Sequence, residues 1–155
     1  MIFIKDKTKQ FILNIKNYEF LNSDILEDLD WLNIEILVSD DFNQWKASGP
    51  YLRTLDLTKL YLWFIKLNEG KEVESRINFL ENELSFEYKK DEQELSINLD
   101  FNLHPKGKKY DYNHDTEYKL IFELKNIDIN IILKSLKKII NDFPIRYFHD
   151  NSSVN

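Results

Sequence analysis

The sequence predicts an α+β fold, in which a mainly antiparallel β-sheet carries two amphipathic helices packed on one face. Several segments alternate apolar and polar residues, as strands with one buried face do, and Trp31–Val38 and Leu95–Leu103 are the clearest. Two others, Leu57–Leu67 and Ile127–Phe143, repeat apolar residues at helical spacing. The turns between the strands are short, which favours antiparallel pairing and a two-layer domain. We expect a single domain over residues 1–146 and a frayed tail over residues 147–155.

The first third of the chain reads as a set of strands joined by turns. Ile2–Ile4 and Phe11–Phe20 predict a strand pair, and Trp31–Val38 predicts the next strand. Asn22–Asp30 reads as an acidic connection with a short helical turn that holds Ile25, Leu26 and Leu29. Phe42–Leu52 returns as a strand, and its Pro50 cannot donate to a ladder. That strand should therefore bend, bulge or lie at a sheet edge there.

The first helix should be well sunk into the core. Its apolar residues form a stripe too wide for one surface to cover: Leu57, Leu60, Tyr61, Trp63, Phe64, Ile65 and Leu67. Asp56 is the expected N-cap, with Thr54 as the alternative. Gly70 suits a left-handed stop at the far end.

Strands follow at Arg76–Phe79, Glu83–Tyr88, Leu95–Leu103 and Tyr118–Leu124. The second helix, Ile127–Phe143, has one apolar side, with Ile131 as the exception, and Pro144 ends it. Because the strands alternate, we expect one sheet with a wet polar face and an apolar face covered by both helices.

Composition excludes several classes of protein. There are no cysteines, so neither disulfides nor thiolate zinc ligands are available, which suits a reducing compartment. No run approaches the roughly 20 apolar residues of a membrane span, and Lys5 and Asp6 interrupt any signal-peptide core. We therefore expect a cytoplasmic protein without membrane contact. The net charge of −6 also argues against binding nucleic acid.

The net negative charge is confined to one region. Residues 17–45 contain eight Asp and Glu residues and no Lys or Arg. Since the whole chain carries −6 and these acids contribute −8, the remainder carries +2. Two readings remain open, a partner-binding surface and a pair of solvated loops, which need not form one patch. The candidate partner-binding residues are Asp24, Glu27, Asp28, Asp30, Asp40 and Asp41.

Catalytic and metal sites have weak support. His104, Asp111, His114 and Asp115 share one loop, but they lack the spacing that pre-forms a metal site. The same loop interleaves basic and aromatic residues, as sites for single-stranded nucleic acid do, and Glu81 and Glu83 could pair as acid and base. A solvated loop and a turn with ordinary solvated acids are the favoured readings of these two features. No nucleophile motif or phosphate loop is present. We expect no catalytic residues, no metal and no cofactor.

The tryptophans have two readings as well. Trp31, Trp45 and Trp63 could anchor an interface, but each lies in a predicted element, so the core is the expected place for at least two of them.

One stretch resembles a known family. The strand WLNIEILV, the Trp45 strand, a helix ending in EGKE and the segment NFLENELSFEY are similar, in this order, to the WapI family of immunity proteins. Asn82 stands where the family often has proline, and the resemblance runs from Trp31 to Pro144. It implies an immunity protein that binds and neutralises the C-terminal domain of a cognate bacterial toxin.

The physical means of neutralisation would be an acidic surface that occupies a basic active site or substrate groove. Fold does not determine function, so two alternatives stay open. One is a housekeeping protein-binding domain of the same fold without a toxin partner, and the other is a small enzyme that uses the 104–115 loop. The oligomeric state is left open.

Overall fold

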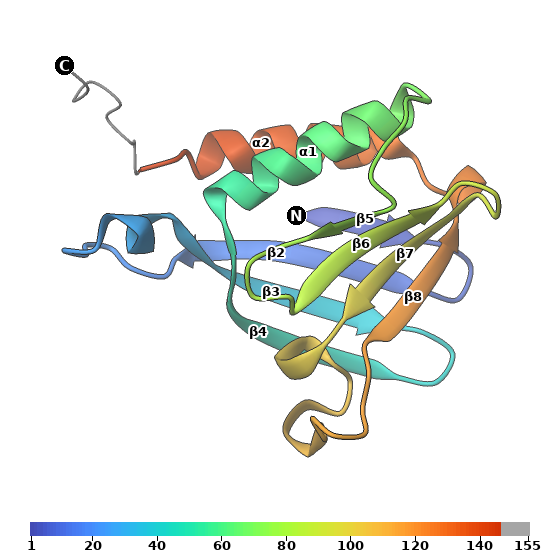
Figure 1. Cartoon of the computed structure of the whole chain (residues 1–155), viewed down its shortest axis with the longest axis horizontal. Helices are drawn as coiled ribbons and strands as arrows, with labels where there is room; N and C mark the ends of the chain where they lie inside the picture. The colour runs from blue at the N-terminus through green and yellow to red at the C-terminus, as the bar shows by residue number, and fades with distance from the viewer. Residues whose placement is uncertain (147–155) are drawn as a thin grey trace.

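Eight strands and two α-helices make up the fold of the described part of the chain (Figure 1). The structure, a computed structural model, describes residues 1–146; the tail predicted over 147–155 lies outside the described residues. The α+β class is confirmed, and the strand pairs are all antiparallel. The expectation of one sheet is wrong, because the strands form two four-stranded sheets with the orders β1-β2-β3-β4 and β5-β6-β7-β8.

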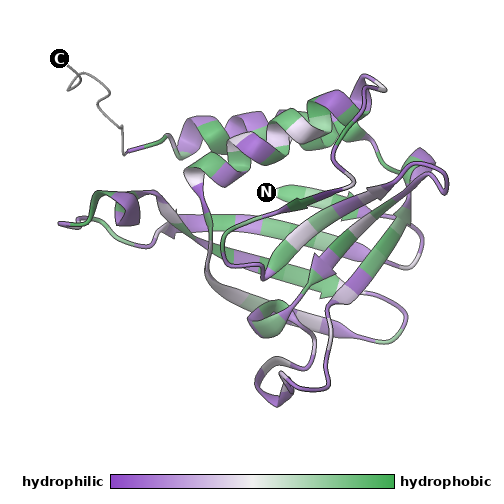
Figure 2. Cartoon of the chain, viewed as in Figure 1, coloured by the Kyte–Doolittle hydropathy of each residue, from purple (hydrophilic) through white to green (hydrophobic). Residues whose placement is uncertain are grey.

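The first sheet comes from the N-terminal third of the chain. Its strands are β1 (Ile2–Lys5), β2 (Gln10–Tyr18), β3 (Trp31–Ser39) and β4 (Gln44–Arg53). Every second residue of β3 from Leu32 to Val38 is buried, as the alternation predicts. Figure 2 shows the hydropathy of the residues along the strands and helices. β4 lies at the sheet edge, and its register against β3 shifts between Leu32 and Ile34. The shift falls opposite Pro50, which confirms the predicted irregularity.

Helix α1 (Thr54–Asn68) follows β4 without a loop. The prediction that Asp56 is the N-cap is wrong, because the backbone leaves the strand at Arg53 and Asp56 lies in the first turn. There its carboxylate accepts the Arg53 N–H at 2.8 Å. The left-handed stop is confirmed: Gly70 has φ +66°, and the Lys71 N–H donates to the Lys66 carbonyl at 2.9 Å.

The second sheet comprises β5 (Arg76–Asn78), β6 (Leu84–Lys89), β7 (Glu94–Leu99) and β8 (Tyr118–Glu123). The strand predicted to run to Leu103 ends at Leu99. Phe101 adopts φ +45°, its N–H donates to the Asp100 side chain at 3.0 Å, and a short 3-10 turn, η2 (Phe101–Leu103), follows. The alternation of apolar residues continues through this turn, so periodicity alone could not mark the end of the strand.

The polar face of the second sheet is buried near its centre, not wet as expected. Ser96 donates to Asn98 at 2.6 Å, and the Asn98 amide donates to Ser85 at 3.2 Å. Longer side chains on the same face form ion pairs, such as Lys119 with Glu87 at 2.9 Å. Short polar residues can therefore be buried without a helix above them, because they satisfy one another.

Helix α2 (Ile129–Asp142) lies beside α1 on the same side of the molecule (Figure 1). It begins at Asp128, whose carboxylate accepts the Asn130 N–H at 3.0 Å. One side is buried, through Ile129, Ile132, Leu136 and Ile139. Ile131 is exposed, as predicted.

The core lies between the two sheets and beneath the helices. Phe86 of β6 is fully buried and contacts three other rings edge to face. The ring centroids lie 6.4 Å from Phe11 of β2, 5.9 Å from Phe64 of α1 and 6.4 Å from Phe79. These four rings join both sheets and α1 into one apolar cluster.

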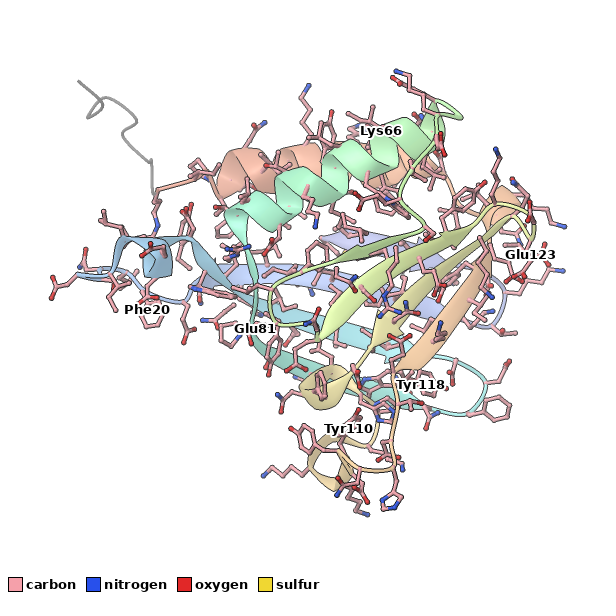
Figure 3. The ribbon with its side chains drawn as sticks, in the orientation of Figure 1. Phe20, Lys66, Glu81, Tyr110, Tyr118 and Glu123 are labelled. Carbon is pink, nitrogen blue, oxygen red and sulfur yellow. The ribbon has the colours of Figure 1, made fainter. Side chains whose placement is uncertain are left out.

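This packing predicts unequal effects of two substitutions in α1. Phe64→Ala removes a fully buried ring and should lower the free energy of unfolding by about 3–5 kcal/mol. Lys66→Ala removes an exposed side chain on the outer side of α1 (Figure 3) and should change it little. Urea unfolding of the two variants measures both effects, and equal losses would show that α1 is oriented differently.

Candidate functional site

The six candidate acids lie in two loops at opposite ends of β3 (Figure 1). Residues 19–30, which we name the acidic loop, carry Asp24, Glu27, Asp28 and Asp30. The turn of residues 40–43 between β3 and β4 carries Asp40 and Asp41. The structure therefore groups four of the acids and separates the other two from them.

Hydrogen bonds close the acidic loop at its two ends and join residues within it. The Glu19 N–H donates to the Trp31 carbonyl at 2.8 Å, which brings the two ends together. Ser23 Oγ accepts the Ile25 N–H at 3.0 Å and donates to the Asp28 carboxylate at 3.3 Å. The 3-10 turn η1 (Leu26–Asp30) completes the loop. This is the construction of a compact Ω-type loop.

Arg146, at the end of the described chain, forms hydrogen bonds with the backbone of the acidic loop. Its guanidinium donates to the carbonyl oxygens of Leu29 at 2.7 Å, Phe20 at 2.6 Å and Leu21 at 3.2 Å. It also lies over the Tyr18 ring, with 3.7 Å between the guanidinium carbon and the ring centroid. A residue more than a hundred positions away thus fixes the path of the loop.

Asp30 belongs to the same arrangement. It is buried, and its carboxylate accepts the backbone N–H of Arg146 at 2.7 Å. The side chain therefore holds the loop to the C-terminal segment, and any contribution to a binding surface is indirect.

The remaining acids of the loop face solvent or lie half-buried. Asp24 and Glu27 are exposed, and Asp28 is half-buried. Within residues 1–146, no Lys or Arg nitrogen lies within the 4.0 Å ion-pair distance of these three carboxylates. Their negative charge is consequently not neutralised by a direct partner in the described part of the chain.

The acids at the other end of β3 differ from each other. Partial burial works to raise the pKa of Asp40, but hydrogen bonds to its carboxylate outweigh this and lower the pKa. The donors are the Tyr118 hydroxyl and the N–H groups of Phe42 at 2.8 Å and Asn43 at 2.7 Å. Asp40 therefore fixes the β3–β4 turn to β8, whereas Asp41 is exposed.

Sequence reasoning missed the apolar part of the acidic loop. The short helical turn was expected to hold Ile25 and Leu26, but it leaves them 59% and 53% exposed. Leu21 is 83% exposed and Phe20 39% exposed (Figure 3). Apolar residues inside a strongly acidic connection were the available signal, and only the structure shows which way they face.

The candidate histidines of the 104–115 loop are bonded to neighbouring residues. His104 is buried, and its Nδ1 accepts the Lys106 N–H at 3.1 Å. His114 is exposed and lies 2.7 Å from the Asp111 carboxylate. Among residues 1–146, no three His, Asp or Glu side chains are grouped so that they could hold a metal ion. Each histidine therefore has a polar partner within the loop.

The other candidate acid–base pair and the tryptophans also have structural roles. Glu83 is buried and accepts the Asn102 N–H at 2.7 Å, while Glu81 is exposed.

Trp63 is buried and donates to the Glu74 carbonyl at 2.9 Å; Trp45 donates to the Leu103 carbonyl at 3.0 Å. Trp31 is half-buried beneath Arg53.

Comparison with protein families shows which family this chain belongs to. A match to the immunity protein WapI-like family covers residues 1–144. The chain belongs to this family. The match includes β1, β2 and the acidic loop, which the resemblance noted from sequence motifs did not reach. No curated protein and no solved structure gives a significant match. Neither α1 nor α2 is long and apolar enough to cross a membrane.

His104 predicts a pH dependence of the stability of this WapI-like protein. Burial lowers the pKa of His104 below its ordinary value of 6.5. Because the unfolded chain then binds a proton more readily, stability should fall as the pH drops below about 6.5. His104→Gln should lose less free energy of unfolding between about pH 7.5 and about pH 5.5 than the unaltered chain.

Urea unfolding of the two proteins at both pH values measures this difference. His114→Gln serves as the control, because its side chain is exposed and should keep the full loss. Equal losses for all three proteins would contradict the assignment.

Proposed function

We propose that this WapI-like protein is an immunity protein that binds and neutralises the C-terminal domain of a cognate bacterial toxin. Membership of the family over residues 1–144 carries the proposal. The role is binding and not catalysis, and it is exercised in the cytoplasm. The bonded state of the polar groups in the 104–115 loop and the absence of cysteine from the chain support these two points.

The acidic loop supplies a physical means of neutralisation. Its exposed carboxylates lack direct cationic partners among the described residues, so their field extends into solvent. A toxin that acts on an anionic substrate has a basic groove, and carboxylates can occupy such a groove in place of the substrate. The acidic surface thus blocks the active site or substrate groove of the toxin.

Of the two acidic regions, the acidic loop is the better docking end. Asp40 already accepts three hydrogen bonds that fix the β3–β4 turn, and using it for a partner would disturb them. Asp24 and Glu27 are exposed and have no such task in the described fold, and the acidic loop that carries them projects from the end of the first sheet (Figure 1). We therefore assign the first contact to Asp24, Glu27 and Asp28, with Asp41 as a secondary contributor.

Charge reversal in the acidic loop should slow association with the toxin domain. Asp24→Lys with Glu27→Lys should lower the on-rate by about tenfold at low ionic strength, because electrostatic steering is lost. The difference from the unaltered chain should shrink as salt is added. Stopped-flow association with the C-terminal domain of the cognate toxin, at two salt concentrations, measures both effects.

A matched control separates position from net charge. Glu81→Lys with Asp91→Lys changes the net charge equally at exposed sites outside both acidic regions, and its on-rate should fall much less. No binding by the unaltered chain would refute the proposed function. Binding that ignores salt and both double reversals would leave the function standing and refute the role of the acids.

A further inference from the structure

We propose that the acidic loop inserts its apolar residues into an apolar cavity ringed by Lys and Arg on the toxin domain. This rests on the proposed function and adds the source of affinity: the acids set the rate of encounter, and Leu21, Ile25 and Leu26 set the lifetime of the complex. The partner surface is thereby specified as an apolar pocket with a cationic rim.

The first support is the exposure of apolar side chains. Phe20, Leu21, Ile25 and Leu26 are 39%, 83%, 59% and 53% exposed, and all four lie within seven residues of one loop. Single exposed apolar residues are ordinary on protein surfaces, but several on one projecting element mark an interaction site. Buried apolar anchors near the centre of an interface supply most of its affinity.

The second support is the pre-formed shape of the loop. The Arg146 guanidinium binds the carbonyls of Phe20, Leu21 and Leu29, and the Ser23 hydroxyl binds the backbone at Ile25. The backbone that carries the apolar residues is thus ordered before the partner arrives. Binding then costs little loop entropy, and more of the contact energy appears as affinity.

The third support is the charge around the apolar residues, which selects the partner. The positive charge of Arg146 is directed at carbonyl oxygens, so Asp24 and Glu27 at the surface remain unpaired among the described residues. An anionic membrane would repel this loop, and so would the same loop of a second copy. A protein cavity lined by apolar residues and bordered by cations fits both features.

Arg146 acts as a positioning residue in this arrangement. Its half-exposed side chain stacks on Tyr18 and bonds the backbone of the loop, so it orders the segment that carries the apolar residues. Arg146→Lys keeps the charge but loses the planar fork that reaches several carbonyls at once.

The decisive experiment changes the apolar residues and leaves the acids in place. Leu21→Ser with Ile25→Ser should raise the Kd for the C-terminal domain of the cognate toxin by about tenfold or more, mainly through faster dissociation. The on-rate and its salt dependence should stay near those of the unaltered chain. Surface plasmon resonance measures both rates, and thermal melting checks that the fold is intact.

A matched control uses exposed apolar residues on the helices. Leu62→Ser with Ile131→Ser changes side chains that are 53% and 56% exposed, outside the acidic loop, and should leave both rates unchanged. Arg146→Lys should slow association and weaken affinity, and protection of the Phe20–Asp30 amides against hydrogen exchange should fall with it.

The outcomes separate this inference from the function on which it rests. If the unaltered chain does not bind the toxin domain, the proposed function fails and the inference fails with it. If the unaltered chain binds and Leu21→Ser with Ile25→Ser binds equally well, the inference alone fails. It also fails if the double variant abolishes a dimer seen by sedimentation, or binding to phosphatidylcholine vesicles, instead of toxin binding.

Discussion

The burial of Phe86 among Phe11, Phe64 and Phe79 is the interaction on which the structure depends. The chain forms two separate sheets, and neither could remain in water with one large apolar face exposed. The four rings bring β2, β6 and α1 to one point and bury these faces against one another. Side chains of both sheets and of α2 then pack into the same continuous core.

Side-chain hydrogen bonds to backbone carbonyls reinforce the same packing. From α1, Lys59 donates to the Asn78 carbonyl of β5 at 3.0 Å, and Trp63 donates to the Glu74 carbonyl at 2.9 Å. The indole N–H of Trp45 in β4 donates to the Leu103 carbonyl of η2. The Lys59 bond occupies a carbonyl of the edge strand β5, which opposes addition of a further strand at that point.

The acidic loop departs from the rules that the rest of the chain follows. It exposes apolar residues, concentrates like charges and depends on a residue from the other end of the chain. Exposed apolar residues lower solubility, and clustered like charges lower stability. Such departures are expected where a surface serves binding. In the proposed function the acids and the apolar residues have complementary parts, since charge acts over distance during encounter and apolar contact acts only after docking.

The sequence by itself determined most of the local structure, because periodicity and turn residues act over a few positions. It placed both helices, all eight strands, the irregularity at Pro50 and the left-handed stop at Gly70, and it located the acidic region and the family. The division into two sheets, the end of β7 at Leu99 and the burial of Asn98 depend on contacts between distant segments. The hydrogen bonds from Tyr118 to Asp40 and from Arg146 to the acidic loop also depend on such contacts. Only the tertiary structure decided these features, because an alternating pattern shows which residues share a face of a strand and not what covers it.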